Sequence, residues 1–145
     1  MILVDTNVFL ELMLNQKQAE SCRQFLEAIS SGRIEAVISR FSIHAIESAI
    51  RAPEVLTTFI VNIDNSTGMY VYETNNSDEL AASLLMKETG LDFDDALKYF
   101  IAKKTGSSAI VSFDRHFDKM DLPRIIPGEA LTRLIPGKSE SNAKD

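Results

Sequence analysis

The chain has 145 residues, of which 45% are hydrophobic and 25% are charged, and its formal net charge is −6. This length and composition are typical of one ordinary globular domain. The negative net charge argues against a protein that binds nucleic acid through an overall positive charge. It is still compatible with nucleic acid as a substrate. No apolar run approaches the roughly 18–20 residues that a membrane helix needs.

The residue types at the start of the chain and the cysteine content both favour a cytoplasmic protein. The first residues lack the basic start and apolar core of a signal peptide. Cys22 is the only cysteine, which fits a reducing compartment. Its place on an apolar helix face indicates a core residue rather than a reactive one.

Short apolar runs alternate with amphipathic stretches, which predicts strands that alternate with helices. The expected strands are residues 1–4, 34–38, 69–72, 107–113 and 122–126. Because Pro123 limits hydrogen bonding, the last strand is expected at a sheet edge. This alternation predicts a parallel α/β sheet covered on both faces.

Turn and capping residues divide the remaining chain into helices. The expected helices start at Thr6 as N-cap, at residue 18, at Ser39 or Ser42, at residue 54, at Asn76 or Ser77, at Asp92 and at residue 129. In the helix that ends near Thr89, Leu80, Leu84 and Leu85 are expected to face inward. Residues 1–135 are expected to form one domain, and the polar residues 136–145 a disordered tail.

Four carboxylates stand where strands end or helices pack. Asp5 and Asp114 directly follow expected strands, Asp95 lies in the first turn of a helix, and Glu47 borders the apolar stripe of the helix before Pro53. Open α/β sheets place their ligand sites at the carboxyl ends of strands. Carboxylates held close together repel one another, and a divalent cation removes that repulsion. Oxygen ligands favour Mg²⁺ or Mn²⁺ over Zn²⁺, and such clusters suit phosphodiester hydrolysis.

Each carboxylate also has a purely structural interpretation. Asp95 can simply favour the start of its helix, and Asp114 can cap a short turn over residues 115–118. An exposed helix glutamate such as Glu47 is ordinary. Asp5 favours a site more strongly, because an unpaired carboxylate at the end of a buried strand is unfavourable.

Other polar side chains surround these positions in the sequence. His44 and His116 lack a partner at metal-ligand spacing, so both are expected at the surface. A group of cations lies close in the sequence to the candidate site. It is expected to form a solvated face, or else to contact a phosphate backbone. These cations are Lys98, Lys103, Lys104, Arg115 and Lys119.

The order of the four carboxylates along the chain, with their flanking residues, resembles that of the PIN-domain ribonucleases. This family includes the toxin nucleases of prokaryotic toxin–antitoxin pairs. The similarity rests on the segments MILVDTN, the helix with Glu47, and DDALKYFIAKKTGSSAIVSFDRHF. Within them, the family hallmarks fall on Asp5-Thr6-Asn7, Glu47, Asp95-Ala96-Leu97 and Ser112-Phe113-Asp114. Asp94 neighbours Asp95 and can share or take its role, although the following Ala-Leu favours Asp95.

The resemblance implies a three-layer α/β/α fold with a central parallel sheet of about five strands. It also implies RNA cleavage that depends on Mg²⁺ or Mn²⁺. Asp5 and Asp95 would hold the principal metal, while Glu47 and Asp114 would complete the acidic ring, orient water or hold a second metal. Thr6, Asn7 and Ser112 would support the carboxylates. Relatives commonly form homodimers, and an antitoxin peptide that covers the acidic pocket inhibits the toxins.

Two other functional classes fit parts of the pattern. One is a non-catalytic module of the same fold that binds RNA or acts as a scaffold. The other is a phosphoacceptor receiver domain, which also uses strand-end aspartates and Mg²⁺. Receivers usually carry adjacent acidic residues after the first strand and a lysine after the last, whereas Thr6 follows Asp5 here and no late strand ends in lysine. The receiver is therefore the weakest of the three hypotheses.

Overall fold

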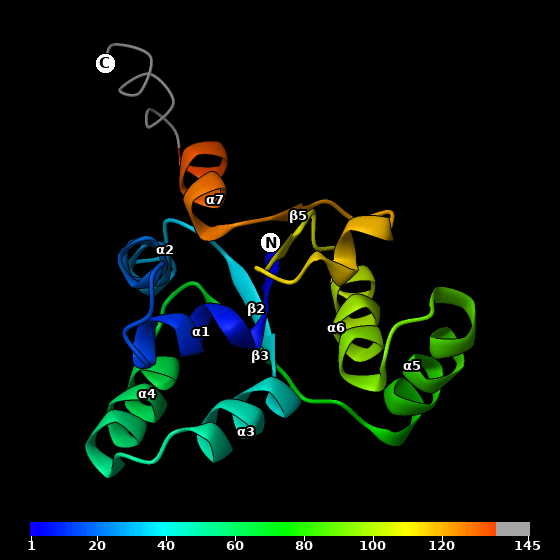
Figure 1. The fold of residues 1–145 in the computed structure, drawn as a ribbon, viewed down its shortest axis with the longest axis horizontal. Helices are drawn as coiled ribbons and strands as arrows, with labels where there is room; N and C mark the ends of the chain where they lie inside the picture. Colours follow the sequence, from blue (N-terminus) through cyan, green and yellow to red (C-terminus); the bar gives the residue numbers. More distant parts are fainter. Residues whose placement is uncertain (136–145) are drawn as a thin grey trace.

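The computed structural model describes residues 1–135, and the expected tail at residues 136–145 lies outside this part. Strands and helices alternate as the sequence predicts (Figure 1). The strands are β1 (Ile2–Val4), β2 (Ala36–Ser39), β3 (Met69–Tyr72), β4 (Ile110–Val111) and β5 (Arg124–Ile125). The helices are α1 (Thr6–Met13), α2 (Ala19–Ser30), α3 (Arg40–Ala49), α4 (Pro53–Asn65), α5 (Asn76–Thr89), α6 (Phe93–Lys104) and α7 (Pro127–Leu134), with a 3₁₀ turn, η1 (Arg115–Lys119), between β4 and β5.

The strands form one sheet in the order β3-β2-β1-β4-β5, and every pair is parallel. β1 is therefore central, and β5 is an edge strand as Pro123 predicts. The strand expected at residues 107–113 is shorter than predicted, because only Ile110 and Val111 pair with β1. Ser112 still donates its backbone N–H to the Ile125 carbonyl of β5 at 3.0 Å, and the chain then leaves the sheet at its carboxyl edge, where β1 also ends.

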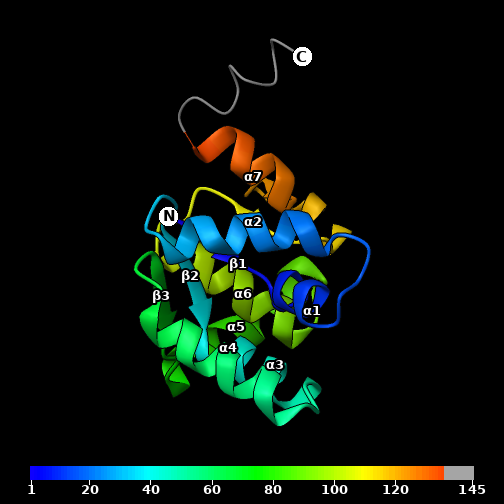
Figure 2. The ribbon, with the colours of Figure 1, turned by 90° about the vertical axis from the view of Figure 1, so that its left-hand side faces the viewer.

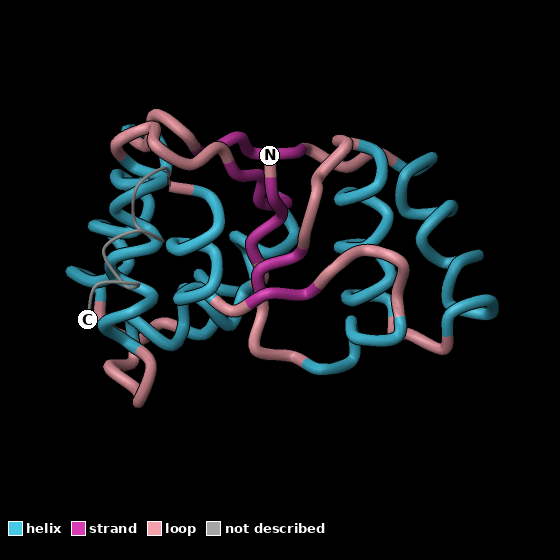
Figure 3. The backbone as a smooth tube through the Cα atoms, turned by 90° about the horizontal axis from the view of Figure 1, so that it is seen from above, coloured by secondary structure: helices cyan, strands magenta, loops and turns pink. Residues whose placement is uncertain are grey.

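Helices cover both faces of the sheet, as the views in Figures 2 and 3 show. Alternation along β1 sends Ile2 and Val4 into one apolar cluster and Leu3 into another. The first cluster includes residues of α1, α2, α3, α4 and α7, and the second includes residues of α5, α6 and η1. The predicted three-layer α/β/α architecture is confirmed. Within residues 1–135, no helix is long and apolar enough to cross a membrane.

Helix starts differ from the predicted caps by one residue in two places. Asp5, rather than Thr6, caps α1, because its carboxylate accepts the backbone N–H of Thr6. Asn75 caps α5 in a reciprocal capping box with Asp78. The expected caps Ser39 of α3 and Asp92 of α6 are confirmed.

The predicted orientation of α5 is wrong for Leu80 and Leu84, whereas Leu85, the third residue expected to face inward, is half-buried. Leu80 and Leu84 are 61% and 63% exposed, whereas Asp78 and Ala82 face inward. Asp78 accepts hydrogen bonds from the Tyr72 hydroxyl, at 3.0 Å, and from the Lys104 ammonium, at 2.7 Å. Residues two apart lie on nearly opposite sides of a helix, so anchoring Asp78 inward turns Leu80 outward. Cys22 is buried in the core, as predicted.

This orientation predicts unequal effects for two chemically identical substitutions. Leu97 of α6 is fully buried, so Leu97→Ala should lower the free energy of unfolding by about 2–5 kcal/mol. Leu84→Ala should change it by no more than about 0.5 kcal/mol, because the side chain is already in solvent. Urea unfolding of both variants measures the difference, and equal losses would contradict the orientation of α5.

Candidate functional site

Asp5 lies at the end of β1 and is only 3% exposed. Its backbone N–H donates to the Val111 carbonyl of β4 at 3.0 Å. One carboxylate oxygen, Oδ1, accepts the Thr6 N–H at 2.7 Å, and the other, Oδ2, accepts the Ser112 hydroxyl at 2.6 Å. The burial that makes an unpaired carboxylate unfavourable is therefore matched by hydrogen bonds from two segments far apart in the sequence.

Ser112 links Asp5 to Asp114. Its hydroxyl oxygen accepts the Asp114 backbone N–H at 2.9 Å and the Asn7 side-chain amide at 3.3 Å. The side-chain amide oxygen of Asn7, Oδ1, in turn accepts the Phe113 N–H at 3.4 Å. The structure thus brings Asn7 and Ser112, two of the expected supporting residues, to the strand-end aspartates. The hydroxyl of Thr6, the third, is buried without a hydrogen-bond partner in the described part of the chain.

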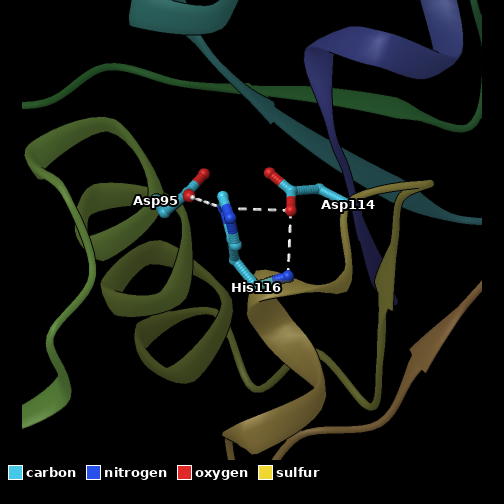
Figure 4. A group of neighbouring side chains, drawn as sticks. All are labelled: Asp95, Asp114 and His116. Atoms are coloured by element: carbon cyan, nitrogen blue, oxygen red, sulfur yellow. Dashed lines mark hydrogen bonds and ion pairs between the residues drawn. The ribbon is translucent and has the colours of Figure 1, made fainter.

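Asp95, Asp114 and His116 come together at this edge of the sheet (Figure 4). His116 Nδ1 lies 3.0 Å from Asp114 Oδ1 and 3.4 Å from Asp95 Oδ2. One ligand atom from each of the three residues lies within 4.8 Å of the other two, close enough to share a metal ion. The expected turn after Asp114 forms as η1, and Asp114 caps it by accepting the His116 N–H at 2.9 Å.

His116 is one site residue that sequence reasoning missed. Its side chain is largely exposed, as expected, but its ring faces two carboxylates. The spacing of two residues from Asp114 brings the groups together only because η1 forms. Phe117, the next residue, is fully buried in the apolar cluster that includes α6 residues, and this holds η1 beside the helix that carries Asp95.

Asp95 is buried among other anions. The pKa of its carboxyl is raised to about 6, mainly by burial and further by the charges of Asp92, Asp114 and Asp5, whereas the charge of Lys98 opposes the shift. Asp92 lies close because its carboxylate accepts the Asp95 N–H as the helix cap. A cation at this position would relieve the repulsion that burial strengthens.

Lys98 corrects the expectation of a solvated basic face. Its side chain is 4% exposed, and its ammonium lies 2.6 Å from Asp5 Oδ1 and 2.9 Å from Asp94 Oδ2. Burial alone would lower the pKa of this ammonium, but the charges of Asp5 and Asp94 outweigh it and raise the pKa. These contacts also distinguish the roles of the two adjacent aspartates. Asp94 pairs with Lys98, whereas Asp95 faces Asp114 and His116.

Two other lysines of the expected basic face are paired with carboxylates. Lys103 pairs with Asp121 at 2.8 Å, and Lys104 pairs with Asp78 at 2.7 Å. Both lysines are nevertheless exposed, as are Arg115 and Lys119, so the expected solvated face holds for these four cations and fails only for Lys98.

Glu47 lies on α3 and remains 30% exposed at its side chain. Its Oε1 is 2.9 Å from Nδ1 of His44, a histidine that is exposed as predicted. Glu47 is not one of the three residues that lie within 4.8 Å of one another. The structure therefore places Glu47 on a neighbouring helix and the other three predicted carboxylates at the strand ends and the start of α6.

A separate cavity of about 540 Å³ opens between α1, α2 and α4. Apolar side chains such as Phe9, Leu26 and Phe59 line it, and the four predicted carboxylates are not among its lining residues. This cavity belongs to the layer of α1, α2 and α4, and the acidic group lies at the carboxyl edge of the sheet. The chemistry of the site therefore rests on the acidic group rather than on this cavity.

The donors at the strand ends fit a divalent cation. Mg²⁺ is commonly held by one or two carboxylates with water filling the other positions, and Mn²⁺ accepts the same oxygen ligands. Asp95 and Asp114 supply such carboxylates, and His116 adds an imidazole nitrogen. A bound cation would offset the neighbouring charges of Asp92, Asp114 and Asp5, which contribute to the raised pKa of Asp95.

Comparison with known proteins gives the class of the fold. A family model described as the PIN domain matches residues 2–122. The chain belongs to the PIN domain family, which confirms the resemblance found in the sequence. Comparison with curated proteins finds no match.

Several solved structures share the fold. A toxin–antitoxin complex from Klebsiella pneumoniae is 15% identical, with a TM-score of 0.69, and the match covers 88% of this chain and 98% of that one. The Mycobacterium tuberculosis toxin VapC20, which cleaves the sarcin–ricin loop, is 18% identical, with a TM-score of 0.71 over 88% and 100% of the two chains. Rickettsia felis VapBC2, bound to a promoter DNA fragment, is 14% identical, with a TM-score of 0.64 over 87% and 98%.

The raised pKa of Asp95 predicts a pH-dependent effect of Asp95→Asn on stability. Below about pH 4 the wild-type carboxyl is protonated in both the folded and the unfolded state. As the pH rises toward 6, the unfolded chain ionises first, so the wild-type protein loses stability. Without metal, Asp95→Asn should therefore have a higher Tm than wild type at about pH 8, and the difference should nearly vanish at about pH 4. Calorimetry in EDTA tests this, and a difference independent of pH would contradict the assigned burial.

Proposed function

We propose that this protein is an endoribonuclease that uses Mg²⁺ or Mn²⁺ to hydrolyse RNA phosphodiester bonds at the site formed by Asp5, Glu47, Asp95 and Asp114. The observation that carries the proposal is the meeting of Asp95 and Asp114 with His116, beside the buried Asp5, in a chain of the PIN family. Family membership supports nuclease chemistry, and the acidic group supports its dependence on metal.

Asp95 and Asp114, with His116, would hold the ion. Held there, an ion would act as a Lewis acid that lowers the pKa of a bound water and stabilises the leaving oxygen. The resemblance implies Asp5 and Asp95 as principal ligands, but the Asp5 oxygens are already bonded to Thr6, Lys98 and Ser112. We therefore assign Asp5 to fixing the site: it holds Ser112, whose hydroxyl accepts the backbone N–H of Asp114.

Glu47 would complete the acidic ring from α3. Its partial exposure and its contact with His44 leave it at the border of solvent, where it could orient a water molecule. This role differs from that of the buried Asp5. Removing the Glu47 carboxylate should therefore lower the cleavage rate less than removing that of Asp5.

RNA as the substrate is supported by the family and by the related VapC20 toxin, which cleaves the sarcin–ricin loop. With a net charge of −6, the protein cannot rely on bulk attraction to a polyanion. Substrate affinity would therefore come from local contacts near the site, including the contact of phosphate oxygens with the bound cation.

The proposed biological role is that of the toxin in a toxin–antitoxin pair. Related structures include toxin–antitoxin complexes from Klebsiella pneumoniae and Rickettsia felis. An antitoxin segment that covers Asp95 and Asp114 would block access of the scissile phosphate. A homodimer is part of the same proposal.

Cleavage of mixed RNA by the purified protein tests the reaction. Cleavage should require Mn²⁺ or Mg²⁺ and stop in EDTA. Asp95→Asn and Asp114→Asn should each lower the rate by about 100-fold or more, because each removes a charge that holds the cation. Asp5→Asn should cause a comparable loss, because the amide has one acceptor oxygen and no charge in place of the two oxygens that hold Thr6, Lys98 and Ser112.

Asp64→Asn is the matched control, since Asp64 is an exposed carboxylate on α4, and its rate should equal that of wild type. Circular dichroism checks that each variant is folded. Cleavage by Asp95→Asn at the wild-type rate would contradict the proposal that the acidic group is the catalytic site. Folded protein that neither binds Mn²⁺ nor cleaves RNA would instead favour a non-catalytic RNA-binding or scaffold module.

A further inference from the structure

The ammonium of Lys98 is a positive charge built into the acidic site. The side chain leaves α6 one turn after Asp94 and is almost fully buried. Its ammonium contacts Asp5 and Asp94 at 2.6 and 2.9 Å. Burying a charge is unfavourable unless it is paired, and here two carboxylates pair with it.

The contacts of Lys98 divide the carboxylates into two groups. Asp5 and Asp94 face the ammonium, whereas Asp95 and Asp114 face His116. Asp92 is occupied as the cap of α6, and Glu47 contacts His44 on α3. The pair without a resident cation is therefore Asp95 and Asp114, and its charge matches one divalent ion.

A second divalent ion at Asp5 would meet two obstacles. The first is occupancy, because Oδ1 already accepts Thr6 N–H and the ammonium, and Oδ2 accepts the Ser112 hydroxyl. The second is charge, because an ion bound to Asp5 would lie beside a buried ammonium, where repulsion is poorly screened by solvent. An ion held by Asp95 and Asp114 does not displace any of these contacts.

We propose that the buried Lys98 ammonium, held between Asp5 and Asp94, occupies the place of a second divalent cation and restricts the site to one metal ion. Lys98 is thus a positioning residue: it fixes Asp5 and sets the metal count without touching substrate. The inference rests on the proposed function, because it concerns the metal of that same site.

Isothermal titration of the full chain with Mn²⁺ tests this proposal. Wild type should bind one Mn²⁺ per chain. Lys98→Gln, whose amide can still donate hydrogen bonds but carries no charge, should bind two. Lys98→Arg keeps the charge and should stay at one. Lys103→Gln is the matched control on the same helix, because Lys103 pairs with the exposed Asp121, and it should also stay at one.

A second variant locates the added ion. Asp5→Asn combined with Lys98→Gln should return the count to one, because the second ion needs the Asp5 carboxylate. If Lys98→Gln folds only when Mn²⁺ is present, the proposal is supported, since the ion then does what the ammonium did. Failure to fold even in saturating Mn²⁺ would overturn it, because the ammonium would then be needed for folding in a way that no ion replaces.

Other outcomes separate this inference from the proposed function. One Mn²⁺ in both wild type and folded Lys98→Gln would overturn the role of Lys98 and leave the nuclease proposal intact. Two Mn²⁺ in wild type would do the same. No Mn²⁺ in either protein would overturn both proposals together.

Discussion

Placing the Asp5 carboxylate at the end of the central strand is unfavourable unless each of its oxygens has a partner, and the fold supplies these partners from three places. The start of α1 provides a backbone N–H, and the residue directly after β4 provides the Ser112 hydroxyl. Helix α6 provides the Lys98 ammonium. Because the Ser112 hydroxyl also accepts the Asp114 N–H, the same contacts fix the second aspartate. The geometry of the acidic site therefore follows from satisfying one buried anion.

The fold could be predicted from local patterns because its elements are short and strongly punctuated. Apolar runs indicated the strands, and alternation with helices indicated a parallel sheet, whose carboxyl ends meet at one edge. The orientation of α5 could not be predicted in this way. Leu80 and Leu84 have the spacing of a buried stripe, but Asp78 is drawn inward by Tyr72 and Lys104, which lie on other elements. A tertiary polar network decided which side of the helix is buried.

The candidate site shows the same division. Asp5 and Asp114 could be found because each directly follows an expected strand, where open α/β sheets place their ligand sites. For Asp5, burial also makes an unpaired carboxylate unfavourable. Lys98 and His116 could not, since the first looks like one lysine among several and the second like a surface histidine. Their contacts depend on how α6 and η1 pack beside the strand ends. Glu47 entered through resemblance to a family, and its observed partner, His44, lies on its own helix.

The burial of Phe117 has a consequence for motion in the protein. This ring lies next to His116 in the chain, three residues after Asp114, and it shares an apolar cluster with Leu97 and Ile101 of α6. The two sides of the proposed metal-binding group are thus anchored in one packed unit, on the face of the sheet opposite α1 and α2. Slow opening of that unit would separate Asp95 from Asp114 while the other layer stayed folded. Amide hydrogens of η1 and α6 should then exchange with solvent together. A bound cation should slow exchange in both elements, because it would link Asp95 of α6 to Asp114 at the start of η1.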